Sequence, residues 1–312
     1  MIAARNYLRK TTTGLLVQAP AKLNLYLDVQ GRRPDGFHDL ETLIVPINLF
    51  DSLYIAPNDA RGSAITLRVH DLRPRENRLS GIDEPIPTDG RNLVVRALEK
   101  LREAIGIDRG AKVELWKRIP SRAGLGGGSS DAAAALVAGL RLWNKRLPQA
   151  AIDEIAAALG SDVPAMLRYG PSVCRGRGEV VEAVRLPARA ACVLVQPPVG
   201  LGAGEVFSQF TPQDRGVHQQ NQREYLMAAL RRGNLAEAGK HLRNDLQEAA
   251  SRFTPWVDRL RKTMERLPVA GHQMSGSGSV YFALCGSLRL ARRVASELRQ
   301  HRLGWVGVAA TL

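Results

Sequence analysis

The chain has 312 residues, of which 45% are hydrophobic and three are cysteine. This length allows two domains with a substantial core, and no stretch approaches the ~20 consecutive apolar residues of a membrane-spanning helix. Cys174, Cys192 and Cys285 lack CxxC spacing and have apolar neighbours. We therefore expect buried, unreactive thiols without a disulfide framework or a zinc site. Because the N-terminal region lacks the apolar segment of a signal peptide, we also expect a cytoplasmic protein.

The net charge of +14 raises the alternative of a nucleic-acid-binding protein. Its distribution and the aromatic content of 5% argue against that class. In the C-terminal region, arginines alternate at helical spacing with apolar residues, which is typical of the solvent face of a packed helix. The arginines are Arg289, Arg292, Arg293 and Arg299, and the apolar residues are Leu288, Ala291, Ala295 and Leu298. We expect no nucleic-acid or membrane partner.

The first hundred residues predict a mostly antiparallel sheet followed by a helix. Short apolar or alternating runs are separated by Gly, Pro, Asp and Asn, which is the pattern of strands and turns. The predicted strands cover residues 14–18, 23–29, 42–47, 53–55 and 65–69. A helix is predicted at 92–105, with Asn92 as its N-cap.

A strand at 113–116 leads into a glycine-rich segment that reads PSRAGLGGGSSDAAAAL from Pro120 to Leu136. Glycines allow positive φ and close approach of the backbone to a bulky anion. We expect Ser129 or Ser130 to cap a helix at 130–143, so that its free N–H groups face a phosphate. The segment lacks the Lys-Ser/Thr ending of the P-loop. Taken alone, it also fits a flexible turn before an amphipathic helix.

The rest of the chain alternates strands and helices. A helix at 148–159 ends at Gly160, and we place a domain boundary between residues 172 and 173. Further strands are predicted at 180–184, 191–196, 271–274, 280–284 and 305–310. Further helices are predicted at 220–231, 235–242, 245–252 and 255–267, together with the arginine-rich segment.

Two more segments carry polar groups suited to chemistry. Lys22 and Asn24 lie on one face of an alternating strand, where they could equally be solvent-exposed. Residues 274–279 read MSGSGS, which also fits a hairpin turn. The order of all three segments along the chain resembles the three-motif pattern of the GHMP kinases, which phosphorylate small metabolites with ATP. The resemblance implies an α+β fold with a ribosomal-S5-like N-terminal domain at 1–172 and a ferredoxin-like C-terminal domain at 173–312.

Other segments resemble one branch of that family, which phosphorylates a cytidyl alcohol of the non-mevalonate isoprenoid pathway. They are Gly36-Phe37-His38, Asn92-Leu93-Val94, Gly160-Ser161-Asp162-Val163-Pro164 and Asn244-Asp245-Leu246. The alternative is a GHMP kinase for homoserine or a mevalonate-type substrate. The chain departs from the branch in Phe37, where tyrosine is usual, in Arg122, where a small residue is commoner, and in the turn at 200–204.

The resemblance implies roles for individual residues. Asp162 is the candidate base, with Lys22 beside it to keep it ionised and to stabilise the developing alkoxide. Without the motifs, Asp162 would be an ordinary carboxylate at a helix end. Substrate binding is expected from Asn24, Phe37 and His38. ATP binding is expected from Pro120, Gly124, Leu125, Gly126, Gly127, Gly128, Ser129 and Ser130. ATP is expected as its Mg²⁺ complex, and no residue is assigned as a metal ligand.

Overall fold

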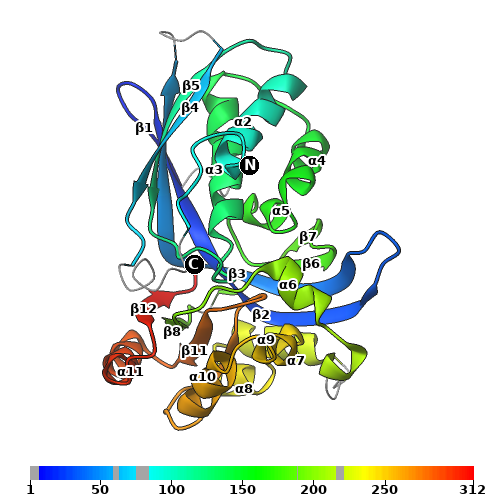
Figure 1. The fold of residues 1–312 in the computed structure, drawn as a ribbon, viewed down its shortest axis with the longest axis vertical. Coiled ribbons are helices and arrows are strands. Elements are labelled where there is room, and N and C mark those ends of the chain that lie inside the picture. Colours follow the sequence, from blue (N-terminus) through cyan, green and yellow to red (C-terminus); the bar gives the residue numbers. More distant parts are fainter. Residues whose placement is uncertain (1–6, 59–62, 75–83, 188, 216–220) are drawn as a thin grey trace.

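The computed structural model describes residues 7–58, 63–74, 84–187, 189–215 and 221–312. The described chain forms two sheets, each with helices packed on it (Figure 1). The larger sheet and its helices come mostly from the first half of the sequence, and the smaller sheet comes from the second half. The predicted α+β class is confirmed. Within the described residues, no helix is long and apolar enough to cross a membrane.

The larger sheet has eight strands, five of which follow the order β1-β2-β3-β5-β4. Strands β6 and β7 extend it beyond β3, and β9 pairs with β2. Most pairs are antiparallel as predicted, whereas β4 with β5 and β2 with β9 are parallel. The strands are β1 (Leu8–Lys10), β2 (Leu15–Arg32), β3 (His38–Pro57), β4 (Ile65–Asp71), β5 (Ala111–Lys117), β6 (Ser172–Gly176), β7 (Val180–Ala183) and β9 (Arg243–Asn244).

Strands β2 and β3 form one long antiparallel ribbon, so the four short strands predicted here were wrong in number. The register shifts between Pro20 and Ala21, again between Asn24 and Tyr26, and again between Val29 and Gly31. Such bulges absorb a proline that a regular ladder would exclude, and they bend the strand without ending it. The turn-like residues in the sequence therefore mark bends within the ribbon.

Helices α2 (Leu93–Ala104), α3 (Gly127–Leu142), α4 (Gln149–Leu159) and α5 (Val163–Met166) lie on one face of this sheet (Figure 1). Asn92 caps α2 by accepting a hydrogen bond of 2.9 Å from the N–H of Val94, as predicted. The predicted cap of α3 was wrong. This helix begins at Gly127, and its N-cap Gly126 offers no side chain to the first N–H groups.

The smaller sheet is antiparallel, with the order β10-β11-β8-β12. Its strands are β8 (Ala191–Gln196), β10 (Gly271–Met274), β11 (Tyr281–Cys285) and β12 (Trp305–Ala310). The accompanying helices are α6 (Ala203–Ser208), the short 3₁₀ helix η3 (Pro212–Arg215), α7 (Gln222–Arg231), α8 (Leu235–Lys240), α9 (Leu246–Ser251), α10 (Trp256–Met264) and α11 (Leu288–Gln300). Residue 220, the first of one predicted helix, lies outside the described residues.

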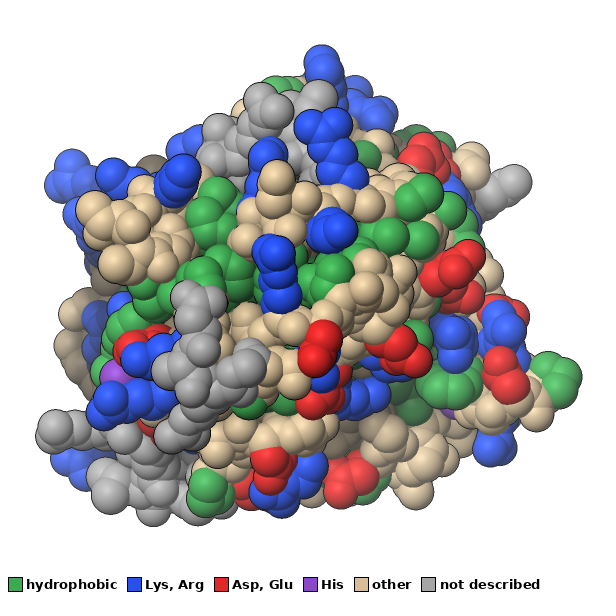
Figure 2. Space-filling model, turned by 90° about the horizontal axis from the view of Figure 1, so that it is seen from above, with side chains coloured by type: hydrophobic (Ala, Val, Ile, Leu, Met, Phe, Trp, Pro, Cys, Tyr) green, Lys and Arg blue, Asp and Glu red, His purple; other side chains and the backbone are tan. Residues whose placement is uncertain are grey.

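Helix α11 confirms the predicted solvent-exposed arginine face. Its four arginines are exposed, whereas Ala291, Ala295 and Leu298 are buried against the smaller sheet. Leu288, expected on the packed side, is 45% exposed at the first turn. On the face of the molecule seen in Figure 2, lysines and arginines are spread among acidic and apolar side chains and do not form a single stripe.

The ribbon of β2 and β3 takes part in three buried cores. Its first part, with Val17 and Leu53, packs with α2 and α3. Its middle, with Leu23 and Val45, packs against β8 and β11, and Val29 near its end reaches the core beneath α9 and α11. The larger sheet includes β6 and β7, which begin at residue 172. The domain boundary between residues 172 and 173 stays a prediction.

The three cysteines are free, and their predicted burial is confirmed. Burial raises the pKa of the Cys174 and Cys192 thiols to about 12 and that of Cys285 to about 11. Thiols with such pKa values hold almost no thiolate near neutral pH, and they are therefore poor nucleophiles.

Candidate active site

A cleft of about 1090 Å³ brings together the three segments that the sequence singled out. Its lining includes Lys22 and Asn24 from β2, the loop before α3, and the loop between β10 and β11. Every predicted site residue lines this cleft except Ser130, which is 1% exposed and lies in the first turns of α3. Segments as far apart in the sequence as Lys22 and Gly278 thus form one cavity.

Lys22 and Asp162 meet in the cleft. The Lys22 Nζ lies 3.3 Å from the Asp162 Oδ2, and the side chains are 4% and 34% exposed, respectively. Asp162 is the residue immediately before α5, and its side chain makes no cap hydrogen bond with that helix. The carboxylate is therefore paired on one side with a buried ammonium group and remains accessible from the cleft.

Asn24 fixes the other side of Lys22. The Lys22 Nζ donates to the Asn24 Oδ1 at 2.6 Å, and the Asn24 Nδ2 donates to the Thr42 Oγ1 at 2.8 Å. The Thr42 hydroxyl in turn donates to the backbone carbonyl of Tyr26 at 2.6 Å. These hydrogen bonds orient the Asn24 amide so that its oxygen faces Lys22. Asn24 therefore helps to hold the Lys22 ammonium group in place.

The loop before α3 has the backbone geometry of an anion cradle. Gly124 and Gly126 have φ of +70° and +67°, a region that L-residues other than glycine rarely adopt. The first N–H groups of a helix have no acceptor within it, and Gly126 supplies no side-chain cap to α3. These donors and the positive end of the helix dipole lie at the cleft, where a phosphate would satisfy both.

The loop of residues 275–279 interlocks with this glycine loop. The Ser275 Oγ donates to the backbone carbonyl of Gly124 at 3.0 Å and accepts from the N–H of Asn24 at 3.3 Å. The N–H of Val280 donates to the carbonyl of Ala123 at 3.1 Å. The second half of the chain therefore sets the position of the glycine loop directly.

Aromatic side chains gather at another part of the cleft lining. Phe37 is 49% exposed, with the Arg177 guanidinium 4.8 Å from its ring centroid. The His38 ring stacks on Phe207 at 5.3 Å and meets Phe210 edge-on at 5.8 Å. Burial, followed by the Arg32 charge, lowers the pKa of His38, so its ring is neutral near pH 7. Sequence reasoning missed Phe207, Phe210 and Arg177, which lie outside the motifs.

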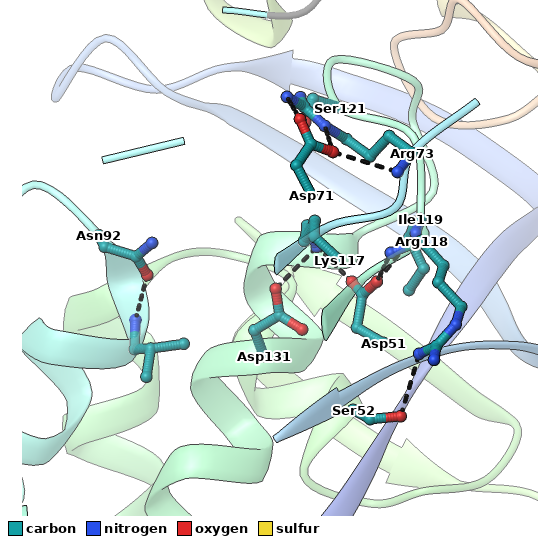
Figure 3. Close-up of polar contacts among 11 residues, drawn as sticks. Asp51, Ser52, Asp71, Arg73, Asn92, Lys117, Arg118, Ile119, Ser121 and Asp131 are labelled. Carbon is teal, nitrogen blue, oxygen red and sulfur yellow. Dashed lines mark hydrogen bonds and ion pairs between the residues drawn. The ribbon is translucent and has the colours of Figure 1, made fainter. Parts of the chain in front are cut away.

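A buried charged cluster beneath the glycine loop was also missed (Figure 3). The Lys117 Nζ donates to the Asp131 Oδ2 at 2.7 Å and also contacts the Asp51 Oδ2. The three side chains are at most 6% exposed. The alternation in β5 could have indicated that Lys117 is buried, because this residue lies on the same face of the strand as the buried Val113 and Leu115.

The cleft offers a metal ion few protein ligands. Among the described residues, no group of three or more His, Cys, Asp and Glu side chains is arranged to hold a metal. The Asp131 Oδ2 is paired with Lys117, and the Ser129 hydroxyl lies in the cleft lining as a further protein oxygen. Mg²⁺ favours such an arrangement, because it keeps several waters and takes few protein ligands.

Comparison with known proteins explains this arrangement. The family models for the N-terminal and C-terminal domains of GHMP kinases match residues 92–170 and 226–302. A 4-diphosphocytidyl-2-C-methyl-D-erythritol kinase of Pelotomaculum thermopropionicum is 38% identical over 283 residues, covering 90% of this chain and 93% of the relative. The chain belongs to this family of GHMP kinases.

Other relatives and solved structures agree with this membership. The enzyme of the same name from Prochlorococcus marinus is 38% identical, covering 94% of this chain and 91% of its own. A crystal structure of 4-(cytidine 5'-diphospho)-2C-methyl-D-erythritol kinase superposes with a TM-score of 0.76 at 34% identity, covering 95% of this chain and 98% of that one. A homoserine kinase of Cytophaga hutchinsonii, 18% identical with a TM-score of 0.67 over 97% and 96% of the two chains, shares the fold. The GHMP kinase fold predicted from the motifs is confirmed.

Proposed function

We propose that this GHMP kinase transfers the γ-phosphoryl group of ATP, supplied with Mg²⁺, to the 2-hydroxyl of 4-diphosphocytidyl-2-C-methyl-D-erythritol. The observation that carries the proposal is the Lys22–Asp162 pair at 3.3 Å in the same cleft as the uncapped N-terminus of α3. The names of the relatives that cover most of the chain support this choice of substrate. Phosphoryl transfer needs both a cradle for the phosphates and a group that receives the proton of the acceptor hydroxyl.

The reaction follows from these positions. The acceptor oxygen attacks the γ-phosphorus as the bond between that phosphorus and the leaving oxygen of ADP breaks, and the hydroxyl proton moves to Asp162. Lys22 pairs with the Asp162 carboxylate and stabilises negative charge that develops on the attacking oxygen. The N–H groups at the start of α3 meet the charge on the transferred group. Mg²⁺ supplies neutralisation of the phosphate oxygens.

The cytidyl end of the substrate fits the aromatic part of the cleft. A cytosine ring has flat faces and an edge with hydrogen-bond donors and acceptors. The exposed ring of Phe37 offers a stacking surface, and neutral His38 has one nitrogen that donates and one that accepts. Phe207 supports the His38 ring from behind by stacking.

A substrate panel tests the proposal. The purified protein is incubated with Mg-ATP and, separately, the cytidyl substrate, homoserine, mevalonate, phosphomevalonate, diphosphomevalonate or galactose, and ADP release is measured. We expect turnover of the cytidyl compound above all others. Faster turnover of homoserine or a mevalonate derivative would move the assignment to another GHMP kinase activity. No turnover, with salt-sensitive binding to RNA or DNA, would favour nucleic-acid binding instead.

A second prediction concerns His38 and pH. Because burial lowers the pKa of His38, we expect cytidyl binding to be constant between about pH 7 and 8. It should weaken at pH values below the ordinary histidine pKa of about 6.5, where the ring gains a proton and loses its acceptor nitrogen. Calorimetric titration with CDP across this range measures the effect. His38→Gln is the control, since any pH dependence caused by His38 must be absent from this variant. If CDP binding to His38→Gln varied with pH as it does in the parent protein, the role of His38 in cytidyl binding would be contradicted.

A further inference from the structure

The cluster of Lys117, Asp51 and Asp131 joins the two ends of the glycine loop (Figure 3). On the entry side, the Asp51 carboxylate accepts the backbone N–H groups of Arg118 and Ile119, the latter at 2.9 Å. These residues directly precede Pro120, where the glycine-rich segment begins. On the exit side, Asp131 lies in α3, one turn beyond its start at Gly127.

Lys117 connects these two sides. Its ammonium group touches Asp51 and lies 2.7 Å from the Asp131 Oδ2. It also lies against the first residue of α3, because a Cβ placed on Gly127 would be 2.8 Å from the Lys117 Nζ. A single cation thus contacts the carboxylate that holds the loop entry, the carboxylate of the helix, and the backbone at the start of the helix.

The burial of these groups indicates that their mutual placement is fixed. A buried ion that loses its partner is costly, so each member restricts the other two. Burial acts to lower the pKa of Lys117, but the two carboxylates outweigh it and raise that pKa, which keeps the ammonium charged; burial raises the pKa of Asp131, and the Lys117 charge opposes this by favouring the carboxylate. The remaining Asp131 Oδ1 is buried without a hydrogen-bond partner in the structure.

We propose that Lys117 is a positioning residue for ATP, which fixes the glycine loop by holding its entry and the start of α3 at a set separation. This inference rests on the proposed function in taking the nucleotide to bind at the loop. Lys117 acts through Asp51 and Asp131, while the backbone N–H groups contact the phosphates. Its loss lets the loop entry move relative to α3, so that the donors no longer converge on one anion.

The test compares nucleotide affinity with cytidyl affinity in the full-length protein. Lys117→Met keeps an apolar chain of similar length and removes the ammonium group. We expect its dissociation constant for a non-hydrolysable ATP analogue to rise at least tenfold, while that for CDP changes by less than twofold. Calorimetry of the Mg²⁺-loaded analogue and of CDP gives both values. Wild-type affinity for the analogue in folded Lys117→Met would overturn the proposal.

Because Lys117→Met leaves two buried carboxylates, a milder variant is measured as well. Asp131→Asn keeps the shape and an acceptor for Lys117 but replaces the ion pair with a neutral hydrogen bond. We expect a rise of at least threefold in the dissociation constant of the analogue, with CDP again unchanged. An unchanged value for the analogue would overturn the proposal, whether or not Lys117→Met folds.

A control separates positioning from general loss of stability. Val294→Ala removes buried methyl groups from α11, which contributes no residue to the cleft. It should lower the melting temperature and leave both affinities unchanged. A loss of analogue affinity in Val294→Ala equal to that in the cluster variants would attribute the effect to stability and overturn the proposal. Failure of the wild-type protein to bind the analogue would instead reject the ATP site, and with it the proposed function.

Discussion

Replacing Asp162 by Asn should lower kcat by about 10²–10⁴ while changing the affinity for an ATP analogue little. Asparagine keeps the size of the side chain and can still accept from the Lys22 Nζ, 3.3 Å from the carboxylate in the parent protein. It cannot take up the proton of the acceptor hydroxyl. The effect should therefore fall on the chemical step, which pre-steady-state phosphoryl transfer and calorimetric titration distinguish from binding.

Asp153→Asn is the matched control for this variant. Asp153 is 31% exposed and paired with Arg168 at 2.8 Å, which resembles the setting of Asp162, but it does not line the cleft. Its kcat should stay within about twofold of the parent, since a surface ion pair contributes only ~0–1 kcal/mol to stability. If Asp162→Asn also kept its kcat within about threefold, or ~0.7 kcal/mol, the proposed base would be wrong.

Gly124→Ala should disrupt the joint between the two halves of the chain. A Cβ on Gly124 would lie 1.9 Å from the backbone oxygen of Ser275, and φ at this residue is +70°. The steric overlap cannot be relieved by turning a side chain, because the atom it meets belongs to the backbone. We expect a loss of about 3–5 kcal/mol in the free energy of unfolding and a fall of at least ~10²-fold in kcat/KM.

Gly128→Ala provides the comparison in the first turn of α3, four residues after Gly124. The nearest atom to a Cβ at this position is the Leu93 Cδ1 at 3.6 Å, an ordinary contact. We expect its unfolding free energy to match the parent within about 0.5 kcal/mol. Urea titration of both variants checks the contrast. Parent-like stability of Gly124→Ala would show that the loops can separate without loss.

The sequence predicted those parts of the site whose chemistry lies in contiguous motifs. Lys22, Asn24 and Asp162 come from short segments with a recognisable order, and the structure places all three in one cleft. Phe207 and Phe210 could not be predicted in this way, since they lie outside any motif and an isolated phenylalanine reads as a core residue. Phe207 comes from α6 and reaches His38, the first residue of β3, only through the tertiary fold.

The longer helices were predicted well, whereas the short helices α5 and α6 were not predicted and the long strands were predicted as separate pieces. Periodic apolar residues identified α2 because its burial follows a single stripe. Pro20 and Asp51 resembled turn residues. In the structure, Pro20 lies at a register shift within β2, and Asp51 forms a buried ion pair with Lys117 of β5. The Asp51–Lys117 pair joins residues 66 positions apart, a distance at which local patterns carry no information about contact.

The continuous ribbon of β2 and β3 has a consequence for how ligands enter. Lys22 lies in the middle of β2, and the strand runs unbroken from the core beneath α3 to the core beneath α9. An enzyme whose lobes are joined by a flexible hinge can open and close its cleft by rotating one lobe against the other. Here the paired strands β2 and β3 run through both lobes. Rotation of one lobe against the other would therefore distort the β2–β3 ladder and break its hydrogen bonds. Access to the cleft therefore depends on the side chains at its rim, such as the exposed Phe37 ring and the Arg177 guanidinium that packs on it, and not on rotation of the lobes.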